Sequence, residues 1–138
     1  MNIGIVVSDF NDFITGNMLT VAKDQAEIIN VSVIEISHVP GAFDIPIIVN
    51  KLLARSDIDA VVTLGAIIKG ETKHDEIIAN STASTLSTLS VTYGKPVSLG
   101  IIGPGMTSDQ AKKRAEPVAK RAVNAARILY NEIQRVEN

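Results

Sequence analysis

Short apolar runs rich in β-branched residues alternate along the chain with longer segments whose apolar residues recur at helical spacing. A run that is apolar at nearly every position is typical of a strand buried on both faces of a parallel sheet. We therefore expect four strands, at Ile3–Val7, Val31–Ile36, Ala60–Ile67 and Val97–Ile102. The expected helices are Phe13–Ile29, Phe43–Ala54, Lys73–Tyr93 and a stretch from about Thr107 to the C-terminus, broken at Pro117.

The order of these segments predicts a doubly wound α/β fold, in which helices cover both faces of one parallel sheet as a three-layer αβα sandwich. A length of 138 residues and an apolar share of 46% suit a single domain, residues 1–138, with a full core. Ligands bind such folds beyond the carboxyl ends of the strands. We expect four junctions to converge there: Ser8–Asp12, His38–Asp44, Gly65–His74 and Leu99–Thr107.

The junction Val61–Ile78 carries the strongest chemical signal, because an apolar strand ends at a glycine turn and a polar helix follows directly. Thr72 and Asp75 have the spacing of a capping box that would start a helix near Lys73. A helix start offers N–H groups and the positive end of a dipole, which suit an anion such as phosphate. His74 is either an ordinary solvent-exposed histidine of a first helical turn or a group beside that anion able to transfer protons near neutral pH, and its proximity to the predicted anion site favours the second.

Other junctions carry side chains with open alternatives. Asp44 follows the tight turn at Pro40-Gly41, and it either stabilises a helix dipole or binds a polyhydroxyl or amine ligand. Phe10 either closes the core or offers its face to a flat heterocycle. His38 is expected to be a partly buried structural histidine. Arg114 is either solvated or a bidentate clamp for phosphate.

The segment Ser81–Thr92 is unusual because eight of its twelve residues are serine or threonine. The periodicity around it and the absence of proline and glycine before Gly94 still favour a helix. Small side chains let a helix approach a neighbour closely, so we expect this one at a symmetric subunit interface.

Composition narrows the possible partners. The net charge is −2, and lysine and arginine form no long run, which argues against nucleic acid or an anionic membrane as partner. Without cysteine and with only two histidines, the chain offers little for a thiolate or metal site. No apolar run approaches the ~20 residues of a membrane span. The N-terminus has no signal-peptide pattern, so a cytoplasmic protein is expected.

Three stretches together resemble the lumazine synthase family: IGIVVSDFNDFIT from residue 3, VPGAFDIP from residue 39 and VVTLGAIIKGETKHDEI from residue 61. The resemblance runs from Ile3 to about Ala126. It implies a flavodoxin-like fold and a transferase that joins 5-amino-6-ribitylaminouracil to 3,4-dihydroxy-2-butanone 4-phosphate. The product would be 6,7-dimethyl-8-ribityllumazine, in the penultimate step of riboflavin biosynthesis, formed without a metal or other cofactor.

The resemblance also implies roles for individual residues. Those that would bind the pyrimidine and its ribityl chain are Phe10, Ala42, Phe43, Asp44, Ala66, Ile67, Ile68 and Leu99. The butanone phosphate would be held by Glu71, Thr72 and Arg114, and His74 would be the catalytic proton shuttle. The family forms homopentamers, sometimes assembled into icosahedral shells of 60 subunits, with sites shared between subunits. The helix Lys73–Tyr93 would line the fivefold channel.

This sequence departs from the common family pattern at several positions. Asp44 stands in place of a frequent glutamate and is one methylene shorter. Leu99 stands where many members have an aromatic residue that completes a neighbouring subunit's site. A second basic residue near the phosphate would be Arg121 or Lys120. The GPGMT loop replaces a more polar sequence, and the chain begins at its first strand, without the N-terminal extension of many members.

Other functions fit the sequence less well. The related archaeal-type riboflavin synthase shares the VPG turn but lacks a stretch like GETKHDE, because its substrate has no phosphate. A non-catalytic shell or ligand-binding protein would be expected to lose His74 or Arg114. A flavodoxin-like binder of flavin phosphate needs a Ser/Thr-rich loop where this chain has Asp9-Phe10-Asn11. Phosphoacceptor receiver domains have a Lys-Pro pair after a strand, whereas Lys95-Pro96 precedes one.

Overall fold

A four-stranded parallel sheet forms the centre of the computed structural model, which describes residues 1–70 and 73–138. Its strands are β1 (Asn2–Ser8), β2 (Ser32–Val39), β3 (Ala60–Ile68) and β4 (Val97–Met106). They lie in the order β2-β1-β3-β4, and every neighbouring pair is parallel. The predicted four-stranded parallel sheet is therefore confirmed, and its strand order is the one found in flavodoxin-like folds.

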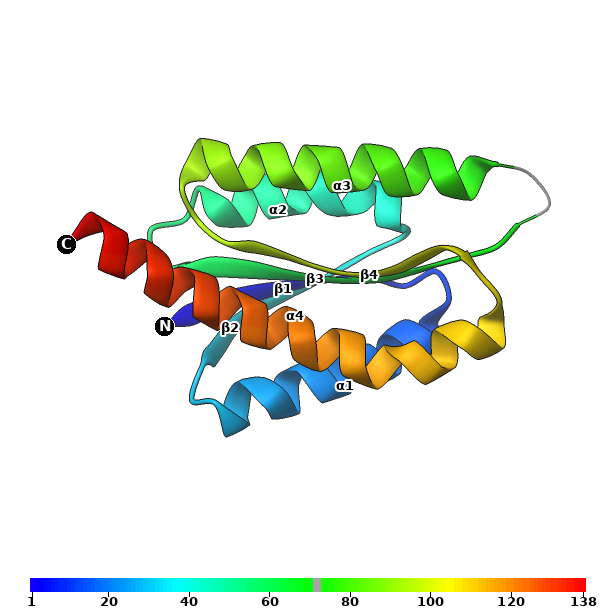
Figure 1. The fold of residues 1–138 in the computed structure, drawn as a ribbon, viewed down its shortest axis with the longest axis horizontal. Coiled ribbons are helices and arrows are strands. Elements are labelled where there is room, and N and C mark those ends of the chain that lie inside the picture. Colours follow the sequence, from blue (N-terminus) through cyan, green and yellow to red (C-terminus); the bar gives the residue numbers. More distant parts are fainter. Residues whose placement is uncertain (71–72) are drawn as a thin grey trace.

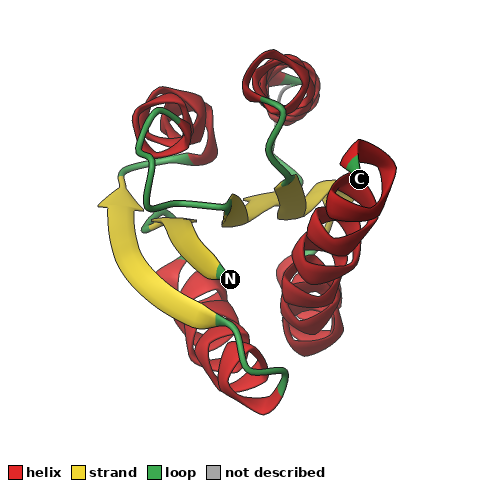
Figure 2. Cartoon of the chain, turned by 90° about the vertical axis from the view of Figure 1, so that its left-hand side faces the viewer, coloured by secondary structure: helices red, strands yellow, loops and turns green. Residues whose placement is uncertain are grey.

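Two helices cover each face of the sheet. α2 (Ile45–Leu53) and α3 (His74–Tyr93) lie on one face, while α1 (Asp12–Ile28) and α4 (Ser108–Glu137) lie on the other (Figure 1). Figure 2 shows the resulting layers, with one helix pair on either side of the twisted sheet. A short 3-10 helix, η1 (Ala42–Asp44), leads into α2. This arrangement confirms the predicted three-layer αβα sandwich.

Each face of the sheet has its own apolar core. Under α1 and α4, Ile5 and Leu64 of the sheet pack with Met18 of α1, all fully buried. Under α2 and α3, Val6 packs with Ile45 of α2. α4 buries mainly small side chains, a stripe of alanines at positions Ala111, Ala115, Ala119, Ala122 and Ala126. Because alanine ends at its Cβ atom, this stripe lets α4 pack close to the sheet.

The edge strand β2 is more exposed than its apolar sequence predicts. Exposed and half-buried positions alternate along it, and Ile34 and Ile36 are each 37% exposed. The prediction that this strand is buried on both faces is wrong. An apolar run of this length does not distinguish a central strand from an edge strand, and β2 lies at the edge of the sheet beside β1.

The C-terminal part also differs from prediction. β4 continues to Met106, so the GPGM stretch lies in a strand rather than in the expected loop. α4 runs through Pro117 without a break, because buried Ala115 and Ala119 hold it on the sheet on both sides of the proline. Its start is as expected, since the Thr107 hydroxyl accepts a hydrogen bond from the Gln110 N–H at 3.2 Å.

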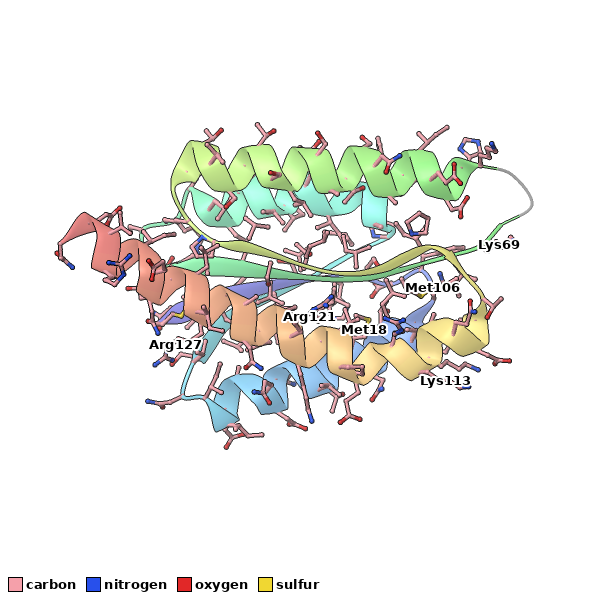
Figure 3. All side chains as sticks on the ribbon, viewed as in Figure 1. Met18, Lys69, Met106, Lys113, Arg121 and Arg127 are labelled. Carbon is pink, nitrogen blue, oxygen red and sulfur yellow. The ribbon has the colours of Figure 1, made fainter. Side chains whose placement is uncertain are left out.

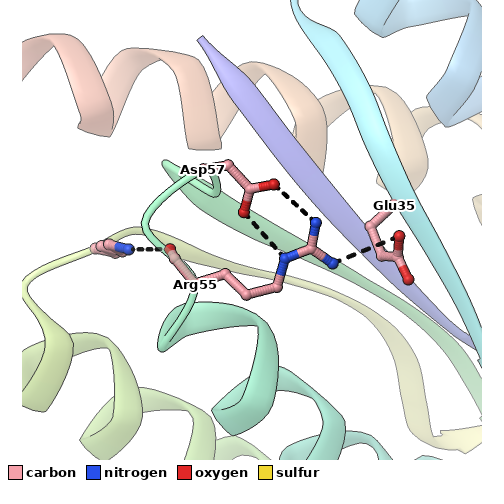
Figure 4. A network of polar contacts seen from close by, with 4 residues as sticks. Glu35, Arg55 and Asp57 are labelled. Atoms are coloured by element: carbon pink, nitrogen blue, oxygen red, sulfur yellow. Dashed lines mark hydrogen bonds and ion pairs between the residues drawn. The ribbon is translucent and has the colours of Figure 1, made fainter.

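The Lys95-Pro96 pair has a structural role at the end of α2. The Lys95 Nζ donates to the carbonyl oxygens of Leu53 at 3.0 Å and Arg55 at 2.9 Å, which lie just where α2 ends. Figure 4 shows the Arg55 side chain held between Asp57 and Glu35. The positive charge of Lys95 also interacts favourably with the negative C-terminal end of the α2 dipole.

The Ser/Thr-rich segment is helical, as predicted, and forms most of α3. Only Thr82 and Leu86 of this helix are buried, so most of its small polar side chains lie on the surface. Within residues 1–70 and 73–138, no helix is both long and apolar enough to cross a membrane.

Candidate active site

A cleft of about 260 Å³ opens at the carboxyl ends of β1, β2 and β3. We name it the Phe10 cleft, and its lining residues are Phe10, Asn11, Gly41, Ala42, Phe43, Ala66, Ile67, Ile68, Gly70, His74, Asp75 and Ile78. They belong to three of the four junctions expected to converge, together with the first turns of α3. The lining is largely apolar with a few polar groups, which is typical of small-molecule sites.

Two aromatic rings stand at the mouth of this cleft. Phe10 is 72% exposed and Phe43 is 64% exposed, so neither ring closes the core. The backbone behind Phe10 is fixed to the end of β2, because the Phe10 N–H donates to the Pro40 carbonyl at 2.9 Å. The neighbouring Asp9 N–H donates to Val39 at 2.8 Å. Of the two alternatives left by the sequence, closure of the core is wrong, and stacking of Phe10 on a ligand stays a prediction.

Asp44 braces the turn that carries Ala42 and Phe43. Its Oδ2 accepts a hydrogen bond from the Gly41 N–H at 3.0 Å, and its own N–H donates to the Gly41 carbonyl at 3.0 Å. Asp44 is not among the residues that line the cleft. The structure therefore gives this carboxylate a local structural role, and contact with a ligand stays a prediction.

The start of α3 forms the rim of the cleft. The helix begins at His74, close to the predicted start at Lys73, and has acidic Asp75 and Glu76 in its first turn. His74 and Asp75 both line the cleft. The positive end of the helix dipole thus faces the site. Glu71 and Thr72, with the predicted capping box of Thr72 and Asp75, lie outside the described residues.

Arg114 and Leu99 do not line the Phe10 cleft. Arg114 borders a separate hollow of about 390 Å³ with Gln110 and Lys113. Figure 3 shows Lys113 on the first part of α4, at the end of the molecule where Lys69 and Met106 also lie. Leu99 is 50% exposed and borders a third hollow, between β4 and α4, together with Arg121. The fourth expected junction therefore contributes no lining residue to the Phe10 cleft, although it contacts the third junction, where the Lys69 N–H donates to the Met106 carbonyl at 2.7 Å.

His38 differs from its prediction as a partly buried residue. Its side chain is 54% exposed, and its Nδ1 lies 2.8 Å from the Asp9 Oδ1. The alternating exposure of the edge strand β2 explains this, since His38 falls on an outward position. It pairs on the surface and does not line the Phe10 cleft.

Sequence reasoning missed several lining residues, chiefly Asn11, which holds the junction after β1. Asn11 adopts a left-handed backbone conformation with φ 66° and donates its Nδ2 to the Ala66 carbonyl at 2.9 Å. The available signal was an asparagine between a strand and a helix, because asparagine tolerates positive φ better than most residues. In the part of the chain that the structure describes, no three histidine or acidic side chains gather as a metal site.

Comparison with known proteins shows the family to which this chain belongs. The family model described as 6,7-dimethyl-8-ribityllumazine synthase matches residues 1–136. A curated relative of that name from Sulfolobus acidocaldarius is 53% identical, and the match covers 99% of this chain and 86% of the relative. Another, from Metallosphaera sedula, is 55% identical, and the match covers 91% of this chain and 83% of the relative. A designed Rossmann-fold protein aligns over 87% of this chain and 99% of its own, with 14% identity and a TM-score of 0.44. The chain belongs to the 6,7-dimethyl-8-ribityllumazine synthase family.

Proposed function

We propose that the Phe10 cleft is where this transferase condenses 5-amino-6-ribitylaminouracil with 3,4-dihydroxy-2-butanone 4-phosphate. The products are 6,7-dimethyl-8-ribityllumazine, phosphate and water. One observation carries the proposal: three strand-end junctions meet around a single apolar cleft whose rim holds His74 and the start of α3. The reaction needs a place for a flat ring and a place for an anion, side by side.

The pyrimidine ring stacks on Phe10. Its exposed ring supplies the aromatic surface, and Ala66, Ile67 and Ile68 at the end of β3 line the same cleft. Holding both substrates in this arrangement accounts for much of the rate enhancement, because it turns a bimolecular condensation into a reaction within one complex.

The ribityl chain lies along η1. Ala42 and Phe43 line the cleft there, and the Asp44 carboxylate follows directly. One oxygen of that carboxylate accepts from Gly41, and a carboxylate has lone pairs for several further hydrogen bonds. Asp44 therefore contacts a ribityl hydroxyl from the turn, directly or through a water molecule.

The butanone phosphate lies at the positive end of α3. Backbone N–H groups of Glu71 and Thr72 bind it, and His74 transfers protons during imine formation, phosphate elimination and ring closure. Each of these steps is an addition, an elimination or a proton transfer. The reaction as proposed therefore draws on no redox or metal cofactor.

Arg114 and Leu99 act on the cleft of a neighbouring subunit. Both are exposed, and neither lines the Phe10 cleft of its own chain, which supports a homo-oligomer with shared sites. The assembly is a pentamer, alone or as part of a 60-subunit shell, with α3 around the fivefold channel. Lys120 pairs with Glu116 at 3.0 Å, whereas Arg121 borders the same hollow as Leu99, so Arg121 is the second basic residue.

The partners and the cellular location of the protein follow from the same proposal. The substrates are two small molecules, and the sequence has no basic run for nucleic acid or for an anionic membrane. We place the protein in the cytoplasm, without a membrane or nucleic-acid partner.

Formation of the lumazine tests the proposed reaction. The protein is incubated with both substrates in the presence of EDTA, and the absorbance of the lumazine is followed against a protein-free control. We expect a rate well above that of the spontaneous reaction. A rate equal to the protein-free control would overturn the proposal.

Subunit mixing tests the shared site. Arg114→Ala and His74→Ala proteins are each expected to be nearly inactive. Dissociated and reassembled together, they should form some sites with His74 from one chain and Arg114 from another, about a quarter of all sites when subunits mix at random. Mixtures no more active than the two separate variants would show that each site lies within one chain.

A further inference from the structure

Asn11 departs from the usual behaviour of a residue at a helix start. It is the N-cap of α1, where an asparagine side chain normally accepts a hydrogen bond from the first turn of its own helix. Here the backbone is left-handed, with φ 66° and ψ 43°, and the side chain makes no such capping bond. Instead, its Nδ2 crosses to β3 and donates to the Ala66 carbonyl at 2.9 Å.

The junction after β1 is consequently fastened on two sides. The Phe10 N–H donates to Pro40 at the end of β2, while the Asn11 side chain donates to Ala66 at the end of β3. The Asn11 carbonyl accepts from the Ile14 N–H at 2.9 Å, which ties the same residue to α1. Phe10 lies between these anchors, and its mostly exposed ring has little packing of its own.

We infer that Asn11 is a positioning residue for the pyrimidine substrate. It fixes the junction that carries Phe10 relative to Ala66 at the end of β3, and both residues line the cleft in which the flat ring would lie. This inference rests on the proposed function of the Phe10 cleft. Asn11 itself lines the cleft, but its amide donates to the Ala66 carbonyl. It therefore acts on the substrate through Phe10 and Ala66.

The chemistry of the amide distinguishes this role from that of a simple turn residue. Glycine at position 11 keeps the positive φ without strain and removes only the bond to Ala66. Aspartate tolerates the same φ, but its ionised carboxylate cannot donate and would face the Ala66 carbonyl oxygen. If Asn11 served only the turn, both replacements would keep its role, because both allow the positive φ. If Asn11 positions the cleft, both replacements lose that role, because neither can donate to the Ala66 carbonyl.

The chain supplies a matched control. Asn30 follows α1 at its other end, has φ 59°, and is the other non-glycine residue with positive φ among those described. Asn30→Gly makes the same chemical change to the same helix, outside the Phe10 cleft. The effect of glycine's greater backbone freedom in the unfolded chain therefore appears in both variants.

The test measures steady-state kinetics for both substrates and the binding of the lumazine product, with the full chain of each variant. For Asn11→Gly we expect the KM for the pyrimidine and the Kd for the lumazine to rise about tenfold, the size of one lost hydrogen bond. The KM for the butanone phosphate should change less than about twofold. Asn11→Asp should raise the pyrimidine KM further, and Asn30→Gly should leave all three constants unchanged.

Two results would overturn the inference. One is an Asn11→Gly protein with the wild-type KM for the pyrimidine. The other is an Asn11→Gly protein whose constants for both substrates change equally and follow its loss of thermal stability, as a structural role requires. A wild-type protein that does not accelerate the condensation would instead overturn the proposed function, so the two failures are distinguishable.

Discussion

Gly103 of β4 lies so close to Ile67 of β3 that a Cβ atom on Gly103 would be 2.1 Å from the Ile67 carbonyl oxygen. Ile67 also lines the Phe10 cleft. The GPGM stretch of β4 therefore packs directly against the backbone of a residue that lines the cleft. Only glycine allows this approach, because its φ of 103° is also unfavourable for any other residue.

Gly103→Ala is expected to destabilise the protein by about 1–3 kcal/mol, since the added methyl group must displace either β4 or the Ile67 carbonyl. Activity should fall as well, because the Ile67 backbone is part of the cleft. Urea unfolding and the lumazine assay measure the two effects. Gly105→Ala is the control: φ is 81° there, but nothing lies within 4 Å of the added atom. Equal losses in both variants would refute the contact with Ile67 as the cause.

His74→Ala is expected to lower kcat by about 10²–10⁴-fold, the usual range for a general acid or base. The comparison variant is His38→Ala, which removes the other histidine, an exposed residue paired with Asp9. That variant should keep wild-type kcat within about twofold. If His74→Ala retained full activity under saturating substrates, His74 would have no part in proton transfer.

Lys95→Met is expected to destabilise the protein by about 1.5–3 kcal/mol, because two carbonyl groups at the end of α2 lose a charged donor. Lys51→Met serves as the control, since Lys51 is exposed in the last turn of the same helix. Chemical denaturation of both variants gives the comparison. Similar losses for the two lysines would mean that charge near α2, rather than these two hydrogen bonds, is what matters.

The Arg55–Asp57 pair should make a small, acid-sensitive contribution to stability. The hydrogen bond from Arg55 lowers the pKa of Asp57 below its ordinary value of 3.8. A carboxyl whose pKa is lower in the folded protein stabilises it fully above the ordinary pKa, and this stabilisation is lost as pH falls through the lowered pKa. The difference in Tm between wild type and Asp57→Asn should therefore be small at pH 7 and shrink further as the pH falls below 3.8. A difference that grows in acid would contradict this assignment.

The sequence predicted most of the fold because hydrophobic periodicity and strand–helix alternation reflect burial directly. The central strands β1 and β3 are apolar on both faces, and they were predicted within a residue or two of their ends. β2 was harder, since Val33, Ile34 and Ile36 read like a central strand although the topology places them at an edge. Pro117 was also misleading, because a local rule of helix breaking cannot include packing against the sheet.

The candidate site could be predicted only in part, for a related reason. Phe10, the turn before Asp44 and the start of α3 stand at strand ends, where parallel sheets gather their ligand contacts. The bond between Asn11 and Ala66 joins residues 55 positions apart, and no local pattern indicates it. Nor does the sequence show whether Arg114 reaches the cleft of its own chain, since that depends on where the first turns of α4 lie relative to the cleft.

Pro117 has a mechanical consequence for the arginine that precedes it by one turn. The proline has no N–H to give to the Lys113 carbonyl, so the backbone ladder of α4 is interrupted just where Arg114 is attached. The direction of the first turns of α4 therefore depends more on the packing of Ala111 and Ala115 against the sheet than on hydrogen bonds to the part of the helix after Pro117. The methyl groups of Ala111 and Ala115 thus position the first turns of α4. A larger side chain at either position would shift the Arg114 guanidinium, while the part of α4 after Pro117 would keep its place on the sheet.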